Sequence, residues 1–369
     1  MKIIKLVILP LILSSACQEL SENEATNTKS NSQEPNIIFM IGDGMGMSQL
    51  SSLYYFKEGE IQINRFSYTG FARTSSATQK ITDSGASGTA LSSGAKTYNG
   101  AIGVDVDTNR VENIVEILSK KGYNTGIIAT STLTHATPAS FFAHAVSRNM
   151  EDFLASQMHN SDVDFFAGGG LKHFNKRRDG NNYLDSLSQN GFVIDTNQLT
   201  SLNGKPLDKK YGFLLQNGAM PKKIDDRDRF LPNATTIATE FLNQKSEPFF
   251  LMVEGSQIDW GGHDNNHEYL VGEMIDFDDA IGKALDFAKK DGNTIVIVTA
   301  DHETGGYTLR SGKNEKGHTD YNVISPSFST GGHSATMVPV LAYGIGAERF
   351  TGIYENTEIF NKLIKLVGE

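Results

Sequence analysis

Four uninterrupted runs of apolar residues recur along the chain, and each is followed by polar residues of the kinds that bind metal ions. Unbroken aliphatic runs of this length are typical of strands that are buried on both faces, as in a parallel sheet covered by helices. In such sheets, ligands bind just beyond the carboxyl ends of the strands. The runs and their followers are Ile37–Ile41 with Asp43, Gly126–Ala129 with His135 and Thr137, Phe249–Val253 with Glu254, Asp259 and His263, and Thr294–Val298 with Asp301 and His302.

Amphipathic stretches between these runs predict helices. The stretch Val111–Leu118 leads into Lys120-Lys121-Gly122, a basic last turn followed by a glycine stop. A longer stretch, from about 268 to 290, has apolar residues every three or four positions and is followed by Asp291-Gly292. Alternation of strands and helices predicts an α/β fold: a central, mostly parallel sheet flanked by helices on both faces, with right-handed crossovers.

One segment of the chain, 152–233, has a different character. It is rich in Asn, Lys, Asp and Gly, and its apolar pieces are short, at Phe165-Phe166, Phe192–Ile194 and Phe213–Leu215. We expect this segment to form an insertion on the same domain. The chain contains 369 residues, which is long enough for one large α/β domain with an insertion of this kind.

The N-terminus has the order of a secretory signal peptide. Lys2 and Lys5 flank the start of the apolar run Leu6–Leu13, and Ser14-Ser15-Ala16 then precedes Cys17. The apolar run is too short to span a membrane. A cysteine after small residues resembles a bacterial lipobox, although Ser14 stands where leucine is more usual. The interpretation is a lipoprotein signal over residues 1–17, and the alternative is an ordinary secretory signal.

The polar residues that follow Cys17 lack hydrophobic periodicity, so residues 18–35 are expected to be a disordered tether and residues 36–369 the folded domain. The predicted location is the periplasm or a lipid-anchored position on the membrane of a bacterium. Cys17 is the only cysteine, which excludes an intrachain disulfide. The net charge is −10 and no long run of lysine or arginine occurs, so the composition argues against a nucleic-acid partner.

A glycine-rich decapeptide, Ile81–Ala90, predicts a tight turn that runs into a helix. The start of a helix has free backbone N–H groups and a favourable dipole, and therefore attracts anions. Ser84 lies where its hydroxyl would face such an anion. The alternative is that Ser84 is only an N-cap residue, since serine is favoured there.

Seven acids and histidines form a candidate ligand constellation. Asp259 and His263 are four residues apart, which places them on one face of a helix, and the adjacent pair Asp301-His302 suits a loop. Histidine with carboxylate suits Zn²⁺, whereas carboxylate with hydroxyl suits Mg²⁺. The complete set is Asp43, Glu254, Asp259, His263, Asp301, His302 and His333.

With these residues in view, the chain resembles the bacterial alkaline phosphatases, and in particular their compact cold-adapted branch, from about residue 36 to 366. Any one shared motif is weak, but six in family order are specific. They are Ile41-Gly42-Asp43-Gly44-Met45-Gly46, Thr82-Asp83-Ser84-Gly85-Ala86-Ser87, His135-Ala136-Thr137-Pro138-Ala139, Glu254-Gly255-Ser256-Gln257-Ile258-Asp259-Trp260-Gly261-Gly262-His263, Thr299-Ala300-Asp301-His302-Glu303-Thr304-Gly305-Gly306 and Gly331-Gly332-His333-Ser334.

The resemblance implies a phosphomonoester hydrolase with broad substrate choice, in which Ser84 becomes a phosphoserine and Arg148 clamps the phosphoryl oxygens. Serine is a weak nucleophile, and zinc would lower the pKa of its hydroxyl. Arginine matches phosphate with two parallel hydrogen bonds. The implied ligands are Asp43, Asp301 and His302 for the zinc that faces Ser84, Asp259, His263 and His333 for a second zinc, and Asp43, Thr137 and Glu254 for one Mg²⁺.

Two residues of the implied substrate site depart from the best-known bacterial member. His135 stands where that member has an aspartate near the magnesium, so it would act through water or admit a third zinc. Trp260 stands where that member has a lysine, and the loss of positive charge predicts weaker phosphate binding. Family members are often dimers, which makes a homodimer one expectation.

Two other functions remain as alternatives. The first is a phosphodiesterase, nucleotide pyrophosphatase or sulfatase on the same scaffold. Ser84-Gly85-Ala86-Ser87-Gly88 lacks the X-Pro-X-Arg continuation of sulfatases, and threonine is the more usual nucleophile of the phosphodiesterases. The second alternative is a surface lipoprotein that stores zinc without catalysis, which the complete set of ligands, nucleophile and arginine disfavours.

Overall fold

The computed structural model describes residues 34–368. The predicted signal peptide, the lipidation of Cys17 and nearly all of the predicted tether therefore lie outside the described residues. No helix among residues 34–368 is long and apolar enough to cross a membrane.

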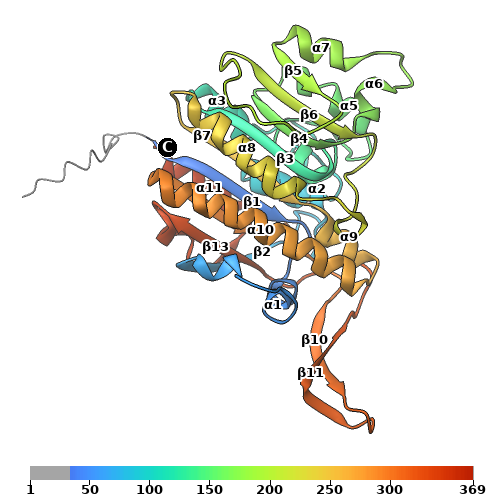
Figure 1. Cartoon of the computed structure of the whole chain (residues 1–369). Coiled ribbons are helices and arrows are strands. Elements are labelled where there is room, and N and C mark those ends of the chain that lie inside the picture. The colour runs from blue at the N-terminus through green and yellow to red at the C-terminus, as the bar shows by residue number, and fades with distance from the viewer. Residues whose placement is uncertain (1–33, 369) are drawn as a thin grey trace, which may run out of the picture. The chain divides into compact units, whose positions relative to one another are not determined.

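A ten-stranded sheet forms the centre of this part of the chain, in the order β14-β2-β13-β8-β1-β7-β3-β4-β6-β5 (Figure 1). Its pairs are parallel except for those of β13, which runs antiparallel to both β2 and β8. The prediction of a mostly parallel sheet is confirmed. The strands are β1 Asn36–Gly42, β2 Tyr68–Arg73, β3 Asn124–Thr132, β4 Phe165–Gly169, β5 Phe192–Asp195, β6 Lys210–Gln216, β7 Phe249–Gly255, β8 Thr294–Thr299, β13 Val338–Gly344 and β14 Gly352–Glu355.

The four predicted apolar runs are four adjacent strands, β8, β1, β7 and β3, in the middle of the sheet. Strand β1 pairs with β7 on one side and with β8 on the other, and every residue of these three strands is buried. Burial on both faces explains why the runs are continuous in apolar residues and do not alternate. The polar residues that follow them are thereby placed at one edge of the sheet.

Helices cover both faces of the sheet, as predicted (Figure 1). Helices α8 and α10 cross one face, and α2 lies behind the sheet in the same view. The helices are α1 Met47–Phe56, α2 Ser84–Ser93, α3 Ile114–Lys120, α4 Ala136–Ala139, α5 Glu151–Ala155, α6 Lys172–Asn175, α7 Tyr183–Gln189, α8 Phe230–Gln244, α9 Gln257–His263, α10 His267–Asp291 and α11 Thr357–Leu366, with 3-10 turns at Gln62–Arg65, Met158–Asn160, Lys223–Asp225 and Ala347–Phe350.

Local capping sets the bounds of the two predicted helices. Helix α10 agrees with the prediction: the Asn266 side chain caps its start, and Gly292 ends it in the left-handed conformation. Helix α3 begins later than predicted, at Ile114. There Asn113 and Glu116 form a capping box, in which each side chain accepts from the backbone N–H of the other. The residues before Asn113 are therefore not helical.

The segment 152–233 contributes three strands to the central sheet. Its short apolar pieces are β4, β5 and β6, and these extend the sheet beyond β3 with parallel pairing. The segment that we expected as an insertion on the same domain thus continues the sheet. Residues 34–369 cluster as one compact unit.

A second, smaller structure interrupts the chain between β8 and β13. Strands β10 Thr308–Lys313 and β11 Thr319–Ser327 form an antiparallel hairpin that extends away from the sheet (Figure 1). At its base, the two-residue strands β9 Glu303–Thr304 and β12 His333–Ser334 pair with each other. This short pairing lies beside the predicted ligands.

We expect the Glu116→Gln change to lower the free energy of unfolding by about 1–2 kcal/mol near neutral pH. Burial opposes the charge on Glu116, but hydrogen bonds from His144, the Asn113 backbone and Arg110 lower its pKa to about 2. A carboxylate with a lowered pKa stabilises the fold above its unfolded pKa, and this contribution disappears as the pH falls toward 2. Denaturant titrations from neutral to acidic pH measure the free energy of unfolding. The difference in this free energy between variant and wild type should become smaller as the pH falls.

The matched control is Glu112→Gln. Glu112 accepts a hydrogen bond from Lys120, but both side chains are exposed. Its loss should change the stability by no more than about 0.5 kcal/mol. Equal effects of the two substitutions would contradict the role given to Glu116.

Candidate active site

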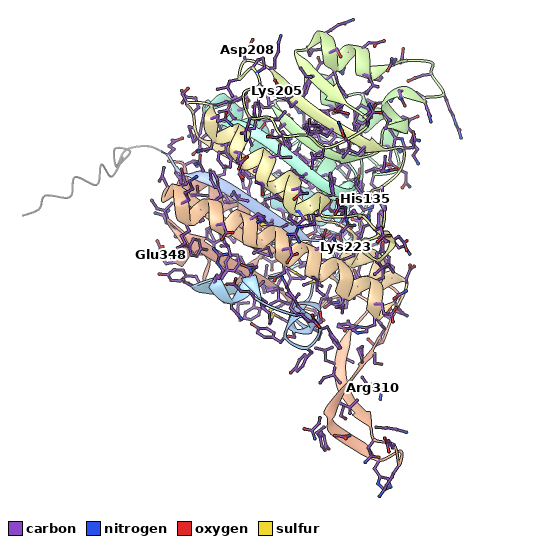
Figure 2. All side chains as sticks on the ribbon, in the orientation of Figure 1. His135, Lys205, Asp208, Lys223, Arg310 and Glu348 are labelled. Atoms are coloured by element: carbon purple, nitrogen blue, oxygen red, sulfur yellow. The ribbon has the colours of Figure 1, made fainter. Side chains whose placement is uncertain are left out.

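The predicted ligands gather at the carboxyl edge of the central strands. Asp43 follows β1, Glu254 lies near the end of β7, and Asp301 follows β8. His333 reaches the same edge because β13 is antiparallel, so the residues just before β13 lie at the carboxyl ends of its neighbours. Figure 2 shows His135 at this end of the sheet, near α9, whereas Glu348 lies at the other end.

Ser84 is the first residue of helix α2, and it is almost completely buried. The N-cap is Asp83, whose side chain accepts from the backbone N–H of Ala86. The interpretation of Ser84 as an N-cap residue is therefore wrong. Because Asp83 takes the capping role, the Ser84 hydroxyl is free to face His302, whose Nε2 lies 3.3 Å from Ser84 Oγ.

A first group of ligand atoms surrounds Nε2 of His302. This nitrogen lies 3.5 Å from Asp43 Oδ1 and 3.2 Å from Asp301 Oδ2, and all three side chains are fully buried. Asp301 Oδ1 accepts from the backbone N–H groups of Gly44 and His302, which leaves Oδ2 without a hydrogen-bond donor. The structure thus brings the first predicted zinc set together.

This arrangement differs from a Ser-His-Asp triad. In a triad the serine and the acid contact opposite nitrogens of the imidazole ring. Here Ser84, Asp43 and Asp301 all face the same nitrogen, Nε2 of His302. Four atoms with lone pairs that converge on one point form a candidate cation site, because a cation would offset their mutual repulsion.

A second group lies on helix α9 and strand β12. Asp259 Oδ1 is 3.3 Å from His263 Nε2 and 3.6 Å from His333 Nε2, and the two nitrogens are 3.2 Å apart. The predicted four-residue spacing places Asp259 and His263 on one face of α9. Both histidines donate Nδ1–H to a backbone carbonyl, His263 to Gly331 and His333 to Thr82, each at 2.8 Å. Their Nε2 atoms are thereby left available for a metal ion.

A third group is formed by Asp43, His135 and Glu254, which offer ligand atoms within 4.8 Å of one another. Thr137 lies beside Glu254, and its hydroxyl oxygen is buried without a partner. Glu254 Oε2 accepts from Ser256 at 2.5 Å, so that Oε1 remains without a donor. Carboxylate and hydroxyl oxygens with one histidine suit Mg²⁺ or a further zinc.

The pKa shifts at the site show that burial disfavours negative charge on three of its acids. Burial, together with the charge of Asp259, raises the pKa of Asp301 to about 6. Burial also raises the pKa of Glu254 to about 8, and it raises the pKa of Asp43 well above its usual value, as do the neighbouring carboxylates. Asp259 behaves differently: burial opposes its charge, but the hydrogen bond with His263 and the neighbouring histidines lower its pKa. Three neighbouring acids therefore lack a counter-charge.

Arg148 lies between the start of helix α2 and the third group. Its guanidinium donates to Asp83 Oδ2 at 2.9 Å and to His135 Nε2 at 3.1 Å. Burial, and then the charge of Arg148, lower the pKa of His135 to about 4, so its ring is neutral and accepts this bond. Trp260 packs edge-on against His135, with 5.8 Å between ring centroids. The predicted substrate residues thus adjoin one another.

Two supporting residues lie inside quoted motifs but were not singled out from the sequence. Asp83 caps helix α2 and holds Arg148, and its place directly before Ser84 is the signal that could have revealed it. Thr304 donates to Asp259 and lies 3.1 Å from His302.

Gly44 has a positive φ of 75°, and a Cβ atom there would lie 2.7 Å from the Asp259 backbone. The glycine motif after β1 therefore makes room for the second group.

A mostly parallel sheet with a buried serine and clustered acids and histidines at its carboxyl edge defines a metal-dependent hydrolase. The chain belongs to the alkaline phosphatase family, because the model described as "Alkaline phosphatase" matches residues 34–326. Members of this family hydrolyse phosphomonoesters, which decides against the phosphodiesterase, sulfatase and zinc-storage alternatives.

Similar proteins agree with this assignment. Alkaline phosphatase 3 of Bacillus subtilis is 34% identical, over 95% of this chain and 93% of its own length. The solved alkaline phosphatase from the Antarctic bacterium TAB5 is 52% identical with a TM-score of 0.89, over 91% of this chain and 98% of that one. The cold-active alkaline phosphatase of a psychrophilic Shewanella is 29% identical with a TM-score of 0.80, over 90% of this chain and the whole of that one. The predicted resemblance to cold-adapted members is confirmed.

We expect the metal-free protein to lose stability as the pH rises from about 5 to 9. In the folded state the pKa values of Asp301 and Glu254 are raised, so folding retains protons that the unfolded chain releases. Stability is therefore highest below the unfolded pKa values and falls as the pH passes through the folded ones. Bound cations remove this penalty, so adding zinc and magnesium should raise the Tm by about 5 °C or more at high pH.

Thermal unfolding of chelator-treated and metal-restored protein, followed by circular dichroism, measures this effect. The gain in Tm should be larger at about pH 9 than at about pH 6. Glu254→Gln is the matched variant, since it removes one titrating acid and should flatten the profile of the metal-free protein. An equal gain in Tm at both pH values would contradict the proposal that the buried acids of the metal-free site lack a counter-charge.

Proposed function

We propose that Ser84 is the nucleophile of this phosphatase, that it forms a phosphoserine intermediate, and that two Zn²⁺ and one Mg²⁺ serve as cofactors. The observation that carries the proposal is the convergence of Ser84 Oγ, Asp43 Oδ1 and Asp301 Oδ2 on Nε2 of His302, within 3.2 to 3.5 Å. A serine hydroxyl aimed into a cation site is activated for attack without a general-base histidine.

The buried oxygens without donors support the cofactor assignment. Unpaired polar atoms are rare in protein interiors because their desolvation is costly. Here they cluster around the three ligand groups, where cations of the proposed kinds would satisfy them. They are both carboxylate oxygens of Asp43, Oδ2 of Asp301, Oε1 of Glu254 and the hydroxyl of Thr137.

The reaction divides into two displacements at phosphorus. The Ser84 oxygen attacks the phosphoryl group, the bond between phosphorus and the substrate alcohol breaks, and the alcohol leaves with a proton. Water then attacks the phosphoserine, and breakage of the bond to the Ser84 oxygen releases inorganic phosphate. When bound, the metal ions lower the pKa of the attacking oxygens and neutralise the charge that develops on the attacking and leaving groups.

The protein itself positions the phosphoryl group. The backbone N–H groups of the first turn of α2 are adjacent to Ser84 and point out of the helix start, where a negative charge is favoured. Arg148, held by Asp83, supplies a planar guanidinium for two phosphoryl oxygens. The charge of the transferring group is spread over its equatorial oxygens, so these fixed donors stabilise the transition state.

We assign Mg²⁺ to the third group, with a third zinc as the alternative. Asp43 is shared between this group and the first, and Thr137 and Glu254 complete the oxygen ligands. His135 would contact the ion through water, since histidine is a poor partner for a hard cation. A solved structure described as the TAB5 mutant His 135 Asp carries Mg in its M3 site, which supports a magnesium preference once a carboxylate replaces the imidazole.

Export of the chain, lipid anchoring through Cys17 and a homodimeric assembly complete the proposal. The first two rest on the charge, apolar run and small residues of the N-terminus. The assembly rests on the resemblance alone. The substrates are small phosphomonoesters, since the site is built around the phosphoryl group.

The Ser84→Ala change is expected to reduce turnover of an aryl phosphate by about 10³-fold or more, because it removes the attacking oxygen. Zinc content should be unchanged, since Ser84 is not required to hold the ions. The control is Ser92→Ala on the same helix, whose hydroxyl bonds only to a backbone carbonyl of that helix and whose loss should leave turnover near wild type. A Ser84→Ala protein with full activity would refute the mechanism.

The Trp260→Lys change is expected to tighten binding of inorganic phosphate. Trp260 lies against His135 beside Arg148, so a lysine there adds a positive charge next to the phosphoryl site. One added charge–phosphate contact predicts an inhibition constant for phosphate that is about 5–10-fold lower. Competitive inhibition at fixed metal concentration measures it, with Trp260→Phe as the neutral control. Equal constants for wild type and Trp260→Lys would refute this effect of charge.

A further inference from the structure

We infer that Thr304 is a positioning residue that joins the two zinc groups, because its one hydroxyl orients Asp259 of the second group and His302 of the first. This inference rests on the proposed function, since it concerns the ligands of the proposed zinc ions. Thr304 is not itself a ligand of either group.

The contacts of Thr304 are short, and they are buried. The side chain is fully buried, and its Oγ1 lies 2.5 Å from Asp259 Oδ1 and 3.1 Å from His302 Nδ1. Asp259 and His302 come from different elements, the helix α9 and the loop after β8. Thr304 is therefore a direct side-chain link between these two ligands.

The direction of the two hydrogen bonds follows from the proton count. A hydroxyl has one proton, and an ionised carboxylate can only accept. The much shorter contact, to Asp259, is therefore the one in which Thr304 donates. Its oxygen then accepts from His302, which places the His302 proton on Nδ1. Nε2 keeps its lone pair, and this is the nitrogen that faces Ser84, Asp43 and Asp301.

The same orientation is produced differently for the other two histidine ligands. His263 and His333 each donate Nδ1–H to a backbone carbonyl, which offers no connection to another ligand. For His302 the acceptor is the Thr304 hydroxyl, which in turn donates its own hydrogen bond to Asp259. A cation at Nε2 of His302 makes Nδ1–H a stronger donor, which polarises the Thr304 hydroxyl and strengthens its bond to Asp259.

The backbone of Thr304 holds this position rigidly. Its N–H donates to the carbonyl of Gly44, and its carbonyl accepts from the Gln49 side chain at 2.8 Å. In the short pairing of β9 with β12, Thr304 lies opposite His333, a third ligand. Gly44 has no Cβ, and one there would lie 2.9 Å from Thr304 Oγ1. The hydroxyl thus has little freedom to turn elsewhere.

The test is zinc affinity measured on metal-free protein in competition with a chromophoric chelator. The Thr304→Val change keeps the branched shape and removes the hydroxyl, and it should weaken both zinc dissociation constants by about 10–100-fold. Thr304→Ser restores the hydroxyl and should return both constants to near the wild-type values. The matched control is Thr299→Val: Thr299 is equally buried, and its hydroxyl donates to the Pro339 carbonyl and not to a ligand.

Each outcome decides a separate point. Wild-type constants in Thr304→Val, or an equal loss in Thr304→Ser, would overturn the role of the hydroxyl. A loss confined to one zinc would overturn the link between the groups. If the wild type itself takes up no zinc, the proposed function fails, and the inference fails with it.

A second measurement needs no variant of Thr304, so it holds even if Thr304→Val does not fold. Nitrogen NMR of the histidine side chains in the zinc-loaded wild type should show His302 protonated at Nδ1 and metal-bound at Nε2. The His302 signals are assigned by comparison with a His302→Gln sample. A His302 ring that lacks the Nδ1 proton would overturn the inference.

Discussion

The structure depends on the cost of burying negative charge. Asp43, Glu254 and Asp301 are buried at one edge of the sheet, and oxygens on each of them have no hydrogen-bond donor. An unpaired ionised group in a protein interior either takes up a proton or finds an opposite charge. Cations would remove this cost, and in the proposed mechanism they also activate Ser84. Binding of the metal ions and catalysis have the same physical origin.

The sheet topology is what brings these acids and histidines together. Parallel strands place the ends of β1, β7, β3 and β8 at one edge, which gathers the residues that follow them. Strand β13 is the one strand of the ten-stranded sheet that runs antiparallel to its neighbours. Its beginning therefore lies at this edge, and the residues just before it, including His333, lie there as well. The hairpin β10–β11 leaves and returns at the same place, so that His302 and His333 meet at its base.

Much of this was predictable from the sequence, and the exceptions have physical reasons. The apolar runs identify the central strands because burial on both faces leaves a local signal. The grouping of acids and histidines could be predicted because metal chemistry restricts the residue types, and that they bind metal ions stays a prediction. The start of α3 was missed because a capping box, and not apolar periodicity, sets it. The place of β4, β5 and β6 in the sheet was not visible, since strands at the end of a sheet have weaker apolar signals and pairing is non-local. Thr304 was missed because a supporting hydroxyl looks like any other threonine.

The wide spacing of the ligands along the chain has a consequence for biogenesis. Asp43 directly follows the first strand, β1, whereas His333 lies in β12, shortly before β13. A ribosome must therefore have made the chain as far as His333 before both proposed zinc groups can be complete. Until then Asp43 lacks its complete set of neighbouring ligands, and a chain that ends before His333 never acquires it. Capture of the proposed ions thus follows synthesis of His333, and a filled centre requires a chain that reaches this residue.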